Sequence, residues 1–230
     1  MICDYASTLE AADPYCLRPD EATTLLAGHP WRRFVVLGDS VASGVGDPVD
    51  GYTKLSWVDR IAAELRDTAP DFAYLNLGER ELLAADVHER QLDTAIAFKG
   101  DLALVACGGN DALRRTYQAD AVDDELAQIV GGLRATGCDV ITVGLFDASH
   151  APLVSDRSRE FVSVRMRALA ERTAAVGARF GSLHVNLSGH PVETDSTMYS
   201  ADGLHGNLRS HAICAAETIR RLGARLGSAT

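Results

Sequence analysis

Five short apolar runs, each bounded by turn residues, constrain the fold of this 230-residue chain more than any other feature. They span residues 34–37, 72–77, 102–107, 140–144 and 183–187. Continuous runs of this length are typical of strands that are buried on both faces of a parallel sheet. Helical patterns lie between the runs, at residues 57–66, 88–97, 121–135 and 157–178, and a last one spans 208–222. Strands that alternate with helices predict an α/β fold, a doubly wound parallel sheet between two layers of helices.

The chain length suits a single domain of this class, and no internal repeat or low-complexity linker divides it. We expect residues 31–230 to form that domain and residues 1–30 to be an N-terminal extension. The segment Pro19-Asp20-Glu21, followed by residues 22–27, is typical of a helix start. The extension is therefore expected to be partly helical, and to pack on the core or to cover a site.

Composition excludes several classes of function. The net charge of -10 and the pI near 5.1 disfavour nucleic acid and anionic membrane as partners, because both require clustered Lys and Arg. No stretch approaches the length of a membrane span, and the first residues lack the pattern of a signal peptide, so we expect a cytoplasmic protein. The five cysteines form no close C-x-x-C pair, and we expect neither a disulfide framework nor a metal site.

A serine follows the first apolar run directly, in the motif Gly38-Asp39-Ser40. A strand that ends there places the hydroxyl at the carboxyl edge of the sheet, where open α/β folds form their binding crevices. A serine hydroxyl is a poor nucleophile at neutral pH, so it needs a general base and donors aimed at the oxyanion. Ser40 is thus a candidate nucleophile, although a serine in this position can also be a simple turn or cap residue.

Two later motifs can supply the missing groups. In Asp202-Gly203-Leu204-His205, the histidine can take the serine proton, and Asp202 can hold its tautomer from three residues away. In Gly109-Asn110-Asp111, the side-chain amide of Asn110 can donate to the oxyanion, or it can cap the helix that follows. The three motifs all fall at strand ends or in loops, as a shared site at one sheet edge requires.

These motifs, in this order, resemble the SGNH hydrolase family, the GDSL-type esterases and lipases, over roughly residues 32–222. The resemblance implies a three-layer α/β/α fold of the SGNH-hydrolase-like, flavodoxin-like kind. It also implies that Ser40, Asp202 and His205 are the catalytic residues, that Ser40 and Asn110 belong to the oxyanion hole, and that no cofactor is used.

One block departs from the family pattern. The family has Asn-x-x-x-x-Gly after the second strand, and the backbone NH of that glycine is an oxyanion donor. Here the segment that begins at Asn76 has Glu81 in the glycine position. A carboxylate beside an oxyanion would oppose its formation unless it turned away or was paired, and Gly78 is the alternative donor if the loop is shifted. The third oxyanion donor, Gly78 or Glu81, therefore stays open at this point.

The expected function is that of a serine esterase or thioesterase that hydrolyses a small to medium acyl ester through an acyl-enzyme on Ser40. The expected partner is this small-molecule ester or thioester. The Glu81 departure leaves two alternatives: an acyltransferase or other non-hydrolytic biosynthetic enzyme with the same fold, and a catalytically silent binding protein that keeps the pocket.

Overall fold

The computed structural model describes residues 8–67, 69 and 71–228, and its centre is a five-stranded sheet. The strand order is β2-β1-β3-β4-β5, and all neighbours are parallel. The strands are β1 (Arg33–Gly38), β2 (Ala73–Asn76), β3 (Leu102–Ala106), β4 (Asp139–Gly144) and β5 (Leu183–Asn186). This order is that of flavodoxin-like doubly wound sheets, and it confirms the predicted fold class.

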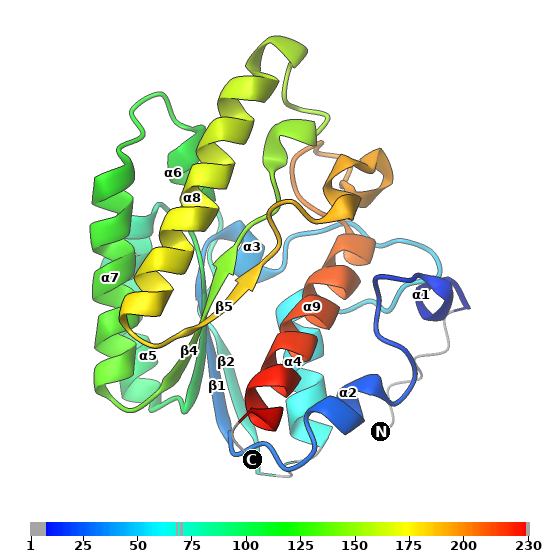
Figure 1. Ribbon diagram of the computed structural model, residues 1–230, viewed down its shortest axis with the longest axis vertical. Coiled ribbons are helices and arrows are strands. Elements are labelled where there is room, and N and C mark those ends of the chain that lie inside the picture. Colours follow the sequence, from blue (N-terminus) through cyan, green and yellow to red (C-terminus); the bar gives the residue numbers. More distant parts are fainter. Residues whose placement is uncertain (1–7, 68, 70, 229–230) are drawn as a thin grey trace.

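Helices cover both faces of the sheet (Figure 1). One layer contains α5 (Ala84–Phe98), α7 (Ala119–Ala135) and α8 (Arg159–Arg179), and the other contains α2 (Glu21–Leu25), α4 (Trp57–Asp67) and α9 (Leu208–Gly227). The short helices are α1 (Thr8–Ala12), α3 (Ser40–Ser43) and α6 (Gly109–Leu113), with 3-10 turns η1 (Ala148–His150), η2 (Asp156–Ser158), η3 (Pro191–Thr194) and η4 (Ser196–Met198). The architecture is therefore three layers, as the alternating pattern predicts.

The two central strands explain why their sequences are continuously apolar. Every residue of β3 is buried, and so is every residue of β1 after Arg33. Both faces of these strands pack against helices, so neither strand has a solvent side on which polar residues would be favoured. The core thus fixes the positions at which β1 and β3 end.

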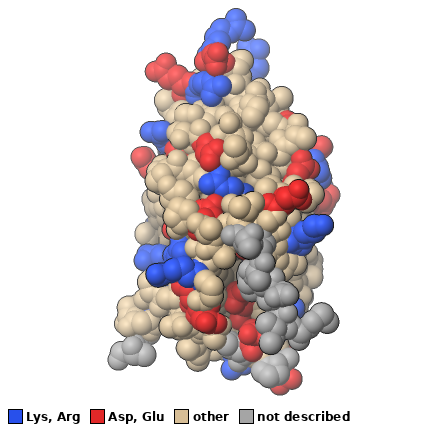
Figure 2. All heavy atoms as spheres, turned by 90° about the vertical axis from the view of Figure 1, so that its right-hand side faces the viewer, with Lys and Arg blue, Asp and Glu red and all other residues tan. Residues whose placement is uncertain are grey.

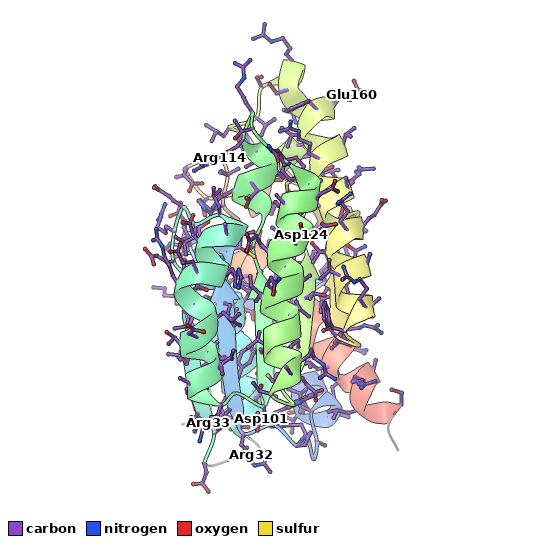
Figure 3. The ribbon with its side chains drawn as sticks, turned by 90° about the vertical axis from the view of Figure 1, so that its left-hand side faces the viewer. Arg32, Arg33, Asp101, Arg114, Asp124 and Glu160 are labelled. Carbon is purple, nitrogen blue, oxygen red and sulfur yellow. The ribbon has the colours of Figure 1, made fainter. Side chains whose placement is uncertain are left out.

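A carboxylate holds β1 and β3 in register at their starts. Asp101, just before β3, accepts hydrogen bonds from the backbone NH groups of Arg32 (2.7 Å) and Arg33 (2.8 Å). The three residues lie together at one end of the sheet, and Arg114 and Glu160 lie toward the other end (Figure 3). Because the register is set at this end, the opposite ends of the two strands are also fixed relative to each other.

The described part of the N-terminal segment is anchored by buried charges. Glu10 of α1 forms an ion pair with Arg60 of α4, and the two residues are only 6% and 3% exposed. Glu10 also accepts a hydrogen bond from the backbone NH of Thr53 at 2.7 Å. Residues 1–7 lie outside the described residues, and the domain division at residue 30 stays a prediction. The segment that begins at α1 therefore packs against the loop that leads into α4.

Acidic and basic side chains are interspersed over the face shown in Figure 2. Such mixed charges interact weakly with one another in water and keep the surface hydrated. Among residues 8–67, 69 and 71–228, no helix combines the length and the apolar composition that crossing a membrane requires.

Replacement of Gly38 tests the tight end of β1. Its φ of 147° is a conformation that L-residues rarely adopt, and a Cβ there would overlap the carbonyl oxygen of Ala106. We expect Gly38→Ala to lower the free energy of unfolding by roughly 3 kcal/mol or more, as measured by urea denaturation. The control is Gly137→Ala, where φ is 85° but the space is open, so only the backbone cost of roughly 1 kcal/mol applies. Equal losses in the two variants would contradict the overlap argument.

Candidate active site

Ser40 is the first residue of α3, directly after β1. The helix begins there because the Asp39 side chain accepts a hydrogen bond from the backbone NH of Val41 at 3.0 Å and so caps the first turn. The Ser40 side chain is nearly buried but lines a cavity at the carboxyl edge of the sheet. The strand end and the capped turn together fix the backbone that carries the hydroxyl.

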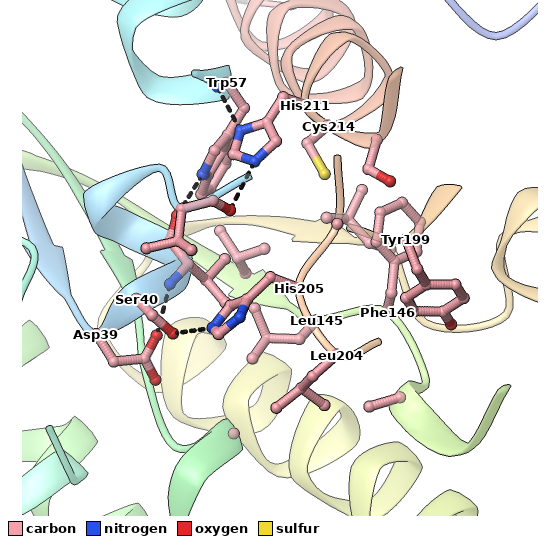
Figure 4. A pocket seen from close by; sticks show the side chains of 18 of the residues that line it. Asp39, Ser40, Trp57, Leu145, Phe146, Tyr199, Leu204, His205, His211 and Cys214 are labelled. Atoms are coloured by element: carbon pink, nitrogen blue, oxygen red, sulfur yellow. Dashed lines mark hydrogen bonds between the residues drawn. The ribbon is translucent and has the colours of Figure 1, made fainter. Parts of the chain in front are cut away.

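Ser40, His205 and Asp202 form a continuous chain of hydrogen bonds. The Asp202 carboxylate is 2.6 Å from Nδ1 of His205. Nε2 of His205 is 2.8 Å from the Ser40 hydroxyl, as Figure 4 shows. A proton on Nδ1 that is donated to Asp202 leaves Nε2 free to accept from the serine. The three residues that the sequence singles out are therefore arranged as nucleophile, base and orienting acid would have to be.

The loop that carries His205 is held at both ends by contacts that local sequence does not indicate. Asp47 binds this loop through three groups. The Asp47 NH donates to the Ser200 hydroxyl at 2.9 Å, and the Asp47 carboxylate accepts from the NH of Ala201 at 2.7 Å. The Asp47 carbonyl accepts from the NH of Leu208 at 3.0 Å. Sequence reasoning missed Asp47, because its partners lie more than 150 residues away and no motif marks it.

The other end of this loop is fixed by a helix cap. The Asn207 side chain accepts from the backbone NH of Arg209 at 3.0 Å and thereby begins α9. Its amide nitrogen donates to the carbonyls of Thr197 (2.7 Å) and Tyr199 (3.2 Å). His205 thus lies two residues before the capped start of α9.

Asn110 reaches the same cavity from the next strand. It is in α6, after β3, and its Nδ2 donates one hydrogen bond to the carbonyl of Leu82 at 2.9 Å. An amide nitrogen carries two hydrogens, so the second remains for another acceptor. Asn110 and Ser40 both line the cavity, which brings an amide donor and the candidate nucleophile to one site.

Gly78 is engaged elsewhere. Its NH donates to the Asn76 side chain at 2.8 Å, and the Asn76 amide in turn donates to the carbonyl of Ala42 at 3.0 Å. A side chain at position 78 would overlap the backbone nitrogen of Ser43. Gly78 therefore allows the loop after β2 to pack closely on α3, and its donor is already used. This arrangement disfavours Gly78 as a donor to an oxyanion.

Glu81 keeps the backbone conformation of a glycine. Its φ is 68°, in the left-handed region that L-residues other than Asn and Asp seldom adopt. The side chain is exposed, and within residues 8–67, 69 and 71–228 no ion pair or hydrogen bond involves Glu81. Neither Glu81 nor Gly78 lines the cavity as the structure stands. The substitution therefore preserves the local turn and keeps the carboxylate in solvent.

The pKa values of two carboxylates of the site are shifted in opposite directions. Burial, together with the nearby Asp111 carboxylate, raises the pKa of Asp39 to about 7. Partial burial also raises the pKa of Asp202, but hydrogen bonds from the NH of Leu204 and from His205 outweigh it and bring the pKa to about 2. Asp202 is consequently ionised at neutral pH and can stabilise a protonated His205, whereas Asp39 carries its proton over much of the acidic range.

The cavity beside Ser40 has a volume of about 130 Å³ and a mainly apolar wall. Its residues come from the segments after β1, β3, β4 and β5, from β4, from α4, α8 and α9, and from the loop that contains His205. Among the residues that the structure describes, no group of three or more His, Cys, Asp or Glu side chains is placed to hold a metal ion.

The chain is similar to a known protein family and to several solved structures. A model of the GDSL-like lipase/acylhydrolase family matches residues 36–213. No curated protein sequence matches the chain. Among solved structures, the fold is similar to that of LAE5, an alpha/beta hydrolase enzyme from the metagenome of Lake Arreo, Spain, at 19% identity and a TM-score of 0.67, over 84% of this chain and 95% of that one.

Two further solved structures have the same fold. One is Axe2, an acetylxylan esterase from Geobacillus stearothermophilus, at 17% identity and a TM-score of 0.66, over 84% of this chain and 94% of that one. The other is the lipase/acylhydrolase from Enterococcus faecalis, at 21% identity and a TM-score of 0.65, over 84% and 96% of the two chains.

Replacement of Asp39 tests the electrostatics of the serine turn. The pKa of Asp39 in the folded protein, about 7, is above the reference value of 3.8. Between these two pH values the folded state binds more protons than the unfolded state. The free energy of unfolding of the wild type therefore falls as the pH rises through this range. Asp39→Asn keeps the acceptor for Val41 and does not titrate. We expect the free energy of unfolding of Asp39→Asn to exceed that of the wild type at pH 8 by a few kcal/mol, about 1.4 for each unit of pKa shift, and the difference to vanish near pH 4.

The measurement is urea denaturation at several pH values. The control is Asp156→Asn, because the Asp156 side chain is almost fully exposed and its replacement should give no such trend. A difference between wild type and Asp39→Asn that does not change between pH 4 and pH 8 would show that Asp39 is ionised in the folded state.

Proposed function

Because the chain belongs to the GDSL-like lipase/acylhydrolase family, we propose that it hydrolyses small to medium acyl esters or thioesters through an acyl-enzyme on Ser40. The observation that carries the proposal is the chain of hydrogen bonds from Ser40 through His205 to Asp202 at the edge of an apolar cavity. A similar structure is named an acetylxylan esterase, and acetyl esters mark the short end of this acyl range.

In the first step, the Ser40 oxygen attacks the acyl carbonyl and its proton passes to Nε2 of His205. The new bond joins Oγ to the carbonyl carbon, and the carbonyl oxygen becomes an oxyanion. Asp202 holds the Nδ1 proton and stabilises the imidazolium that forms. The intermediate then collapses, the bond to the leaving oxygen or sulfur breaks, and His205 gives its proton to the leaving group.

In the second step, water releases the acid. His205 takes a proton from water as the water oxygen attacks the acyl carbon, and collapse of the second intermediate breaks the bond to Oγ. His205 returns the proton to Ser40, which restores the starting state. No cofactor takes part in either step.

The oxyanion needs donors that are in place before the reaction. We assign this role to the backbone NH of Ser40 at the start of α3, to the free hydrogen of Asn110 Nδ2, and to the backbone NH of Glu81. Support for Glu81 comes from its glycine-like φ of 68° and from the fact that the Gly78 NH is already engaged by Asn76. Since Glu81 does not line the cavity, its loop must move closer when a substrate is bound.

Single and double replacements of Ser40 and His205 test the mechanism. We expect Ser40→Ala and His205→Ala each to lower kcat/KM for p-nitrophenyl butyrate by roughly 10⁴-fold or more, and the double variant to lose little more, because the residues act as a unit. Controls are Ser182→Ala, whose hydroxyl has no partner among the described residues, and His88→Ala, on α5. If the loss of kcat/KM in the double variant equalled the product of the two single losses, the shared mechanism would be contradicted.

Product analysis separates hydrolysis from the alternatives. Incubation with an ester in the presence of a primary alcohol gives free acid if water is the acceptor, and a new ester if the alcohol is. A fluorophosphonate probe labels Ser40 in either case, whereas a silent binding protein would not be labelled. Free acid as the main product supports the proposal.

Replacement of Glu81 distinguishes a role of its backbone from a role of its carboxylate. If only the NH acts, Glu81→Gln and Glu81→Gly should both keep kcat within a few-fold of the wild type, and the glycine variant should also gain up to roughly 1 kcal/mol in stability by relief of the positive φ. Steady-state kinetics and urea denaturation provide the two measurements.

The matched control is Lys99→Gly, because Lys99 also has a positive φ, 56°, at the C-terminal end of α5. It should gain stability in the same way with no change in kcat. A loss of more than 100-fold in folded Glu81→Gln would mean that the carboxylate itself takes part in the reaction.

A further inference from the structure

The cavity beside Ser40 is lined mainly by apolar side chains. Asn110, Leu204 and His205 of this lining are half-buried. We call the buried apolar part of the lining the inner wall, and its residues, each less than 10% exposed, are Trp57, Val143, Met166, Leu187, Met198 and Cys214. Figure 4 shows Cys214 on α9 and Tyr199 opposite Ser40 across the site. A group attached to the Ser40 oxygen would therefore extend toward buried apolar side chains.

The buried histidine of the wall offers nothing to a polar ligand. Nδ1 of His211 accepts from the backbone NH of Trp57 at 3.0 Å, and Nε2 donates to the carbonyl of Val45 at 3.1 Å. Burial lowers the pKa of His211 to about 4, and the charge on Arg60 also lowers it, so the ring is neutral at physiological pH. Both nitrogens are used, and only carbon atoms remain to face the cavity.

Three other polar side chains of the cavity lining are used in the same way. They donate to backbone carbonyls: the Trp57 indole to Val41 (2.7 Å), the Ser210 hydroxyl to Met198 (2.5 Å) and the Tyr199 hydroxyl to Glu193 (3.3 Å). The donor hydrogens of these side chains are therefore all engaged. A substrate oxygen that entered here would lose its water without gaining a side-chain donor, which is costly. The cavity therefore favours a group without hydrogen-bond acceptors.

We propose that the cavity binds an unsubstituted aliphatic acyl chain of about six carbons, so that the preferred substrates are medium-chain acyl esters. This inference rests on the proposed function and narrows its substrate. Apolar cavities of about 150 Å³ stay dry and bind benzene, a molecule of six carbons. A cavity of about 130 Å³ with this wall is suited to a chain of the same order of size.

The size of the effect follows from burial of methylene groups. Each one that moves from water into the cavity raises kcat/KM by roughly fourfold, if its burial is complete in the transition state. From acetyl to hexanoyl the chain gains four methylenes, so the expected rise is on the order of 10²-fold. For chains longer than the cavity, kcat/KM should rise no further, because additional methylenes find no space in it.

The experiment measures kcat/KM of the wild type for p-nitrophenyl acetate, butyrate, hexanoate, octanoate and dodecanoate. We expect a maximum at hexanoate or octanoate and a fall at dodecanoate. If kcat/KM for the acetate equalled or exceeded that for the hexanoate, the chain-length inference would be overturned and the proposed function would remain intact. No turnover of any ester would instead overturn the proposed function.

A cavity-filling variant tests the location. Cys214→Leu adds apolar volume to the inner wall, and we expect it to lower the ratio of kcat/KM for hexanoate to that for acetate by at least tenfold. The matched control is Cys138→Leu, a buried cysteine outside the cavity, which should leave this ratio unchanged. An unchanged ratio in folded Cys214→Leu would place the acyl chain elsewhere.

Two further measurements apply if Cys214→Leu does not fold. Leu145→Ala enlarges the cavity and should move the optimum toward longer chains by two or more carbons. Ser40→Ala, which cannot form the acyl-enzyme, should bind p-nitrophenyl hexanoate at least tenfold more tightly than the acetate in equilibrium titration. Equal binding of the two esters, or an optimum that does not move, would contradict the proposal.

Discussion

The parallel pairing of β1 with β3 is the constraint on which the candidate site depends. Asp101 fixes the register at the start of the two strands, and Gly38 lets β1 end in close contact with the carbonyl of Ala106. Because the strands run in the same direction, the segments after them meet at one edge, and Ser40 and Asn110 reach the same cavity. This is the switch point of a doubly wound sheet, where the chain turns to opposite sides and leaves a crevice.

The third part of the site comes from a distant segment and needs its own support. His205 follows a loop that Asp47 binds through its NH, carbonyl and carboxylate, and it precedes the capped start of α9. The loop that contains Asp47 packs against the N-terminal segment. Glu10 of that segment forms a buried ion pair with Arg60 and accepts a hydrogen bond from the NH of Thr53 in the loop. Loss of one partner of a buried ion pair leaves an uncompensated charge, so this support is sensitive to single changes. The N-terminal segment thus packs against the loop whose Asp47 binds the His205 segment.

Burial assigns different tasks to chemically similar groups of the site. Asp202 is half-exposed and receives hydrogen bonds, which keeps it ionised beside His205, whereas Asp39 is buried and holds its proton to a higher pH. Environments that push the pKa values of two carboxylates apart are a common device in enzymes. The two histidines differ in a similar way: His205 has one nitrogen on the serine, and His211 has both nitrogens committed to the backbone. Only the first can exchange a proton with a substrate.

The five strands, the two helix layers and the three motifs of the site could be predicted from the sequence alone. Continuous apolar runs require burial on both faces, and the order of the runs and helices leaves few topologies. The start of α5 was not determined in this way. The pattern predicts a helix from His88, but the structure begins it at Ala84, where Asp111 of another element accepts the NH of Ala84 and Asp86 accepts that of Leu83. The left-handed turn at Glu81, the contacts of Asp47 and the apolar cavity become visible only in the folded chain. Each of them depends on which distant residues pack together rather than on local preference.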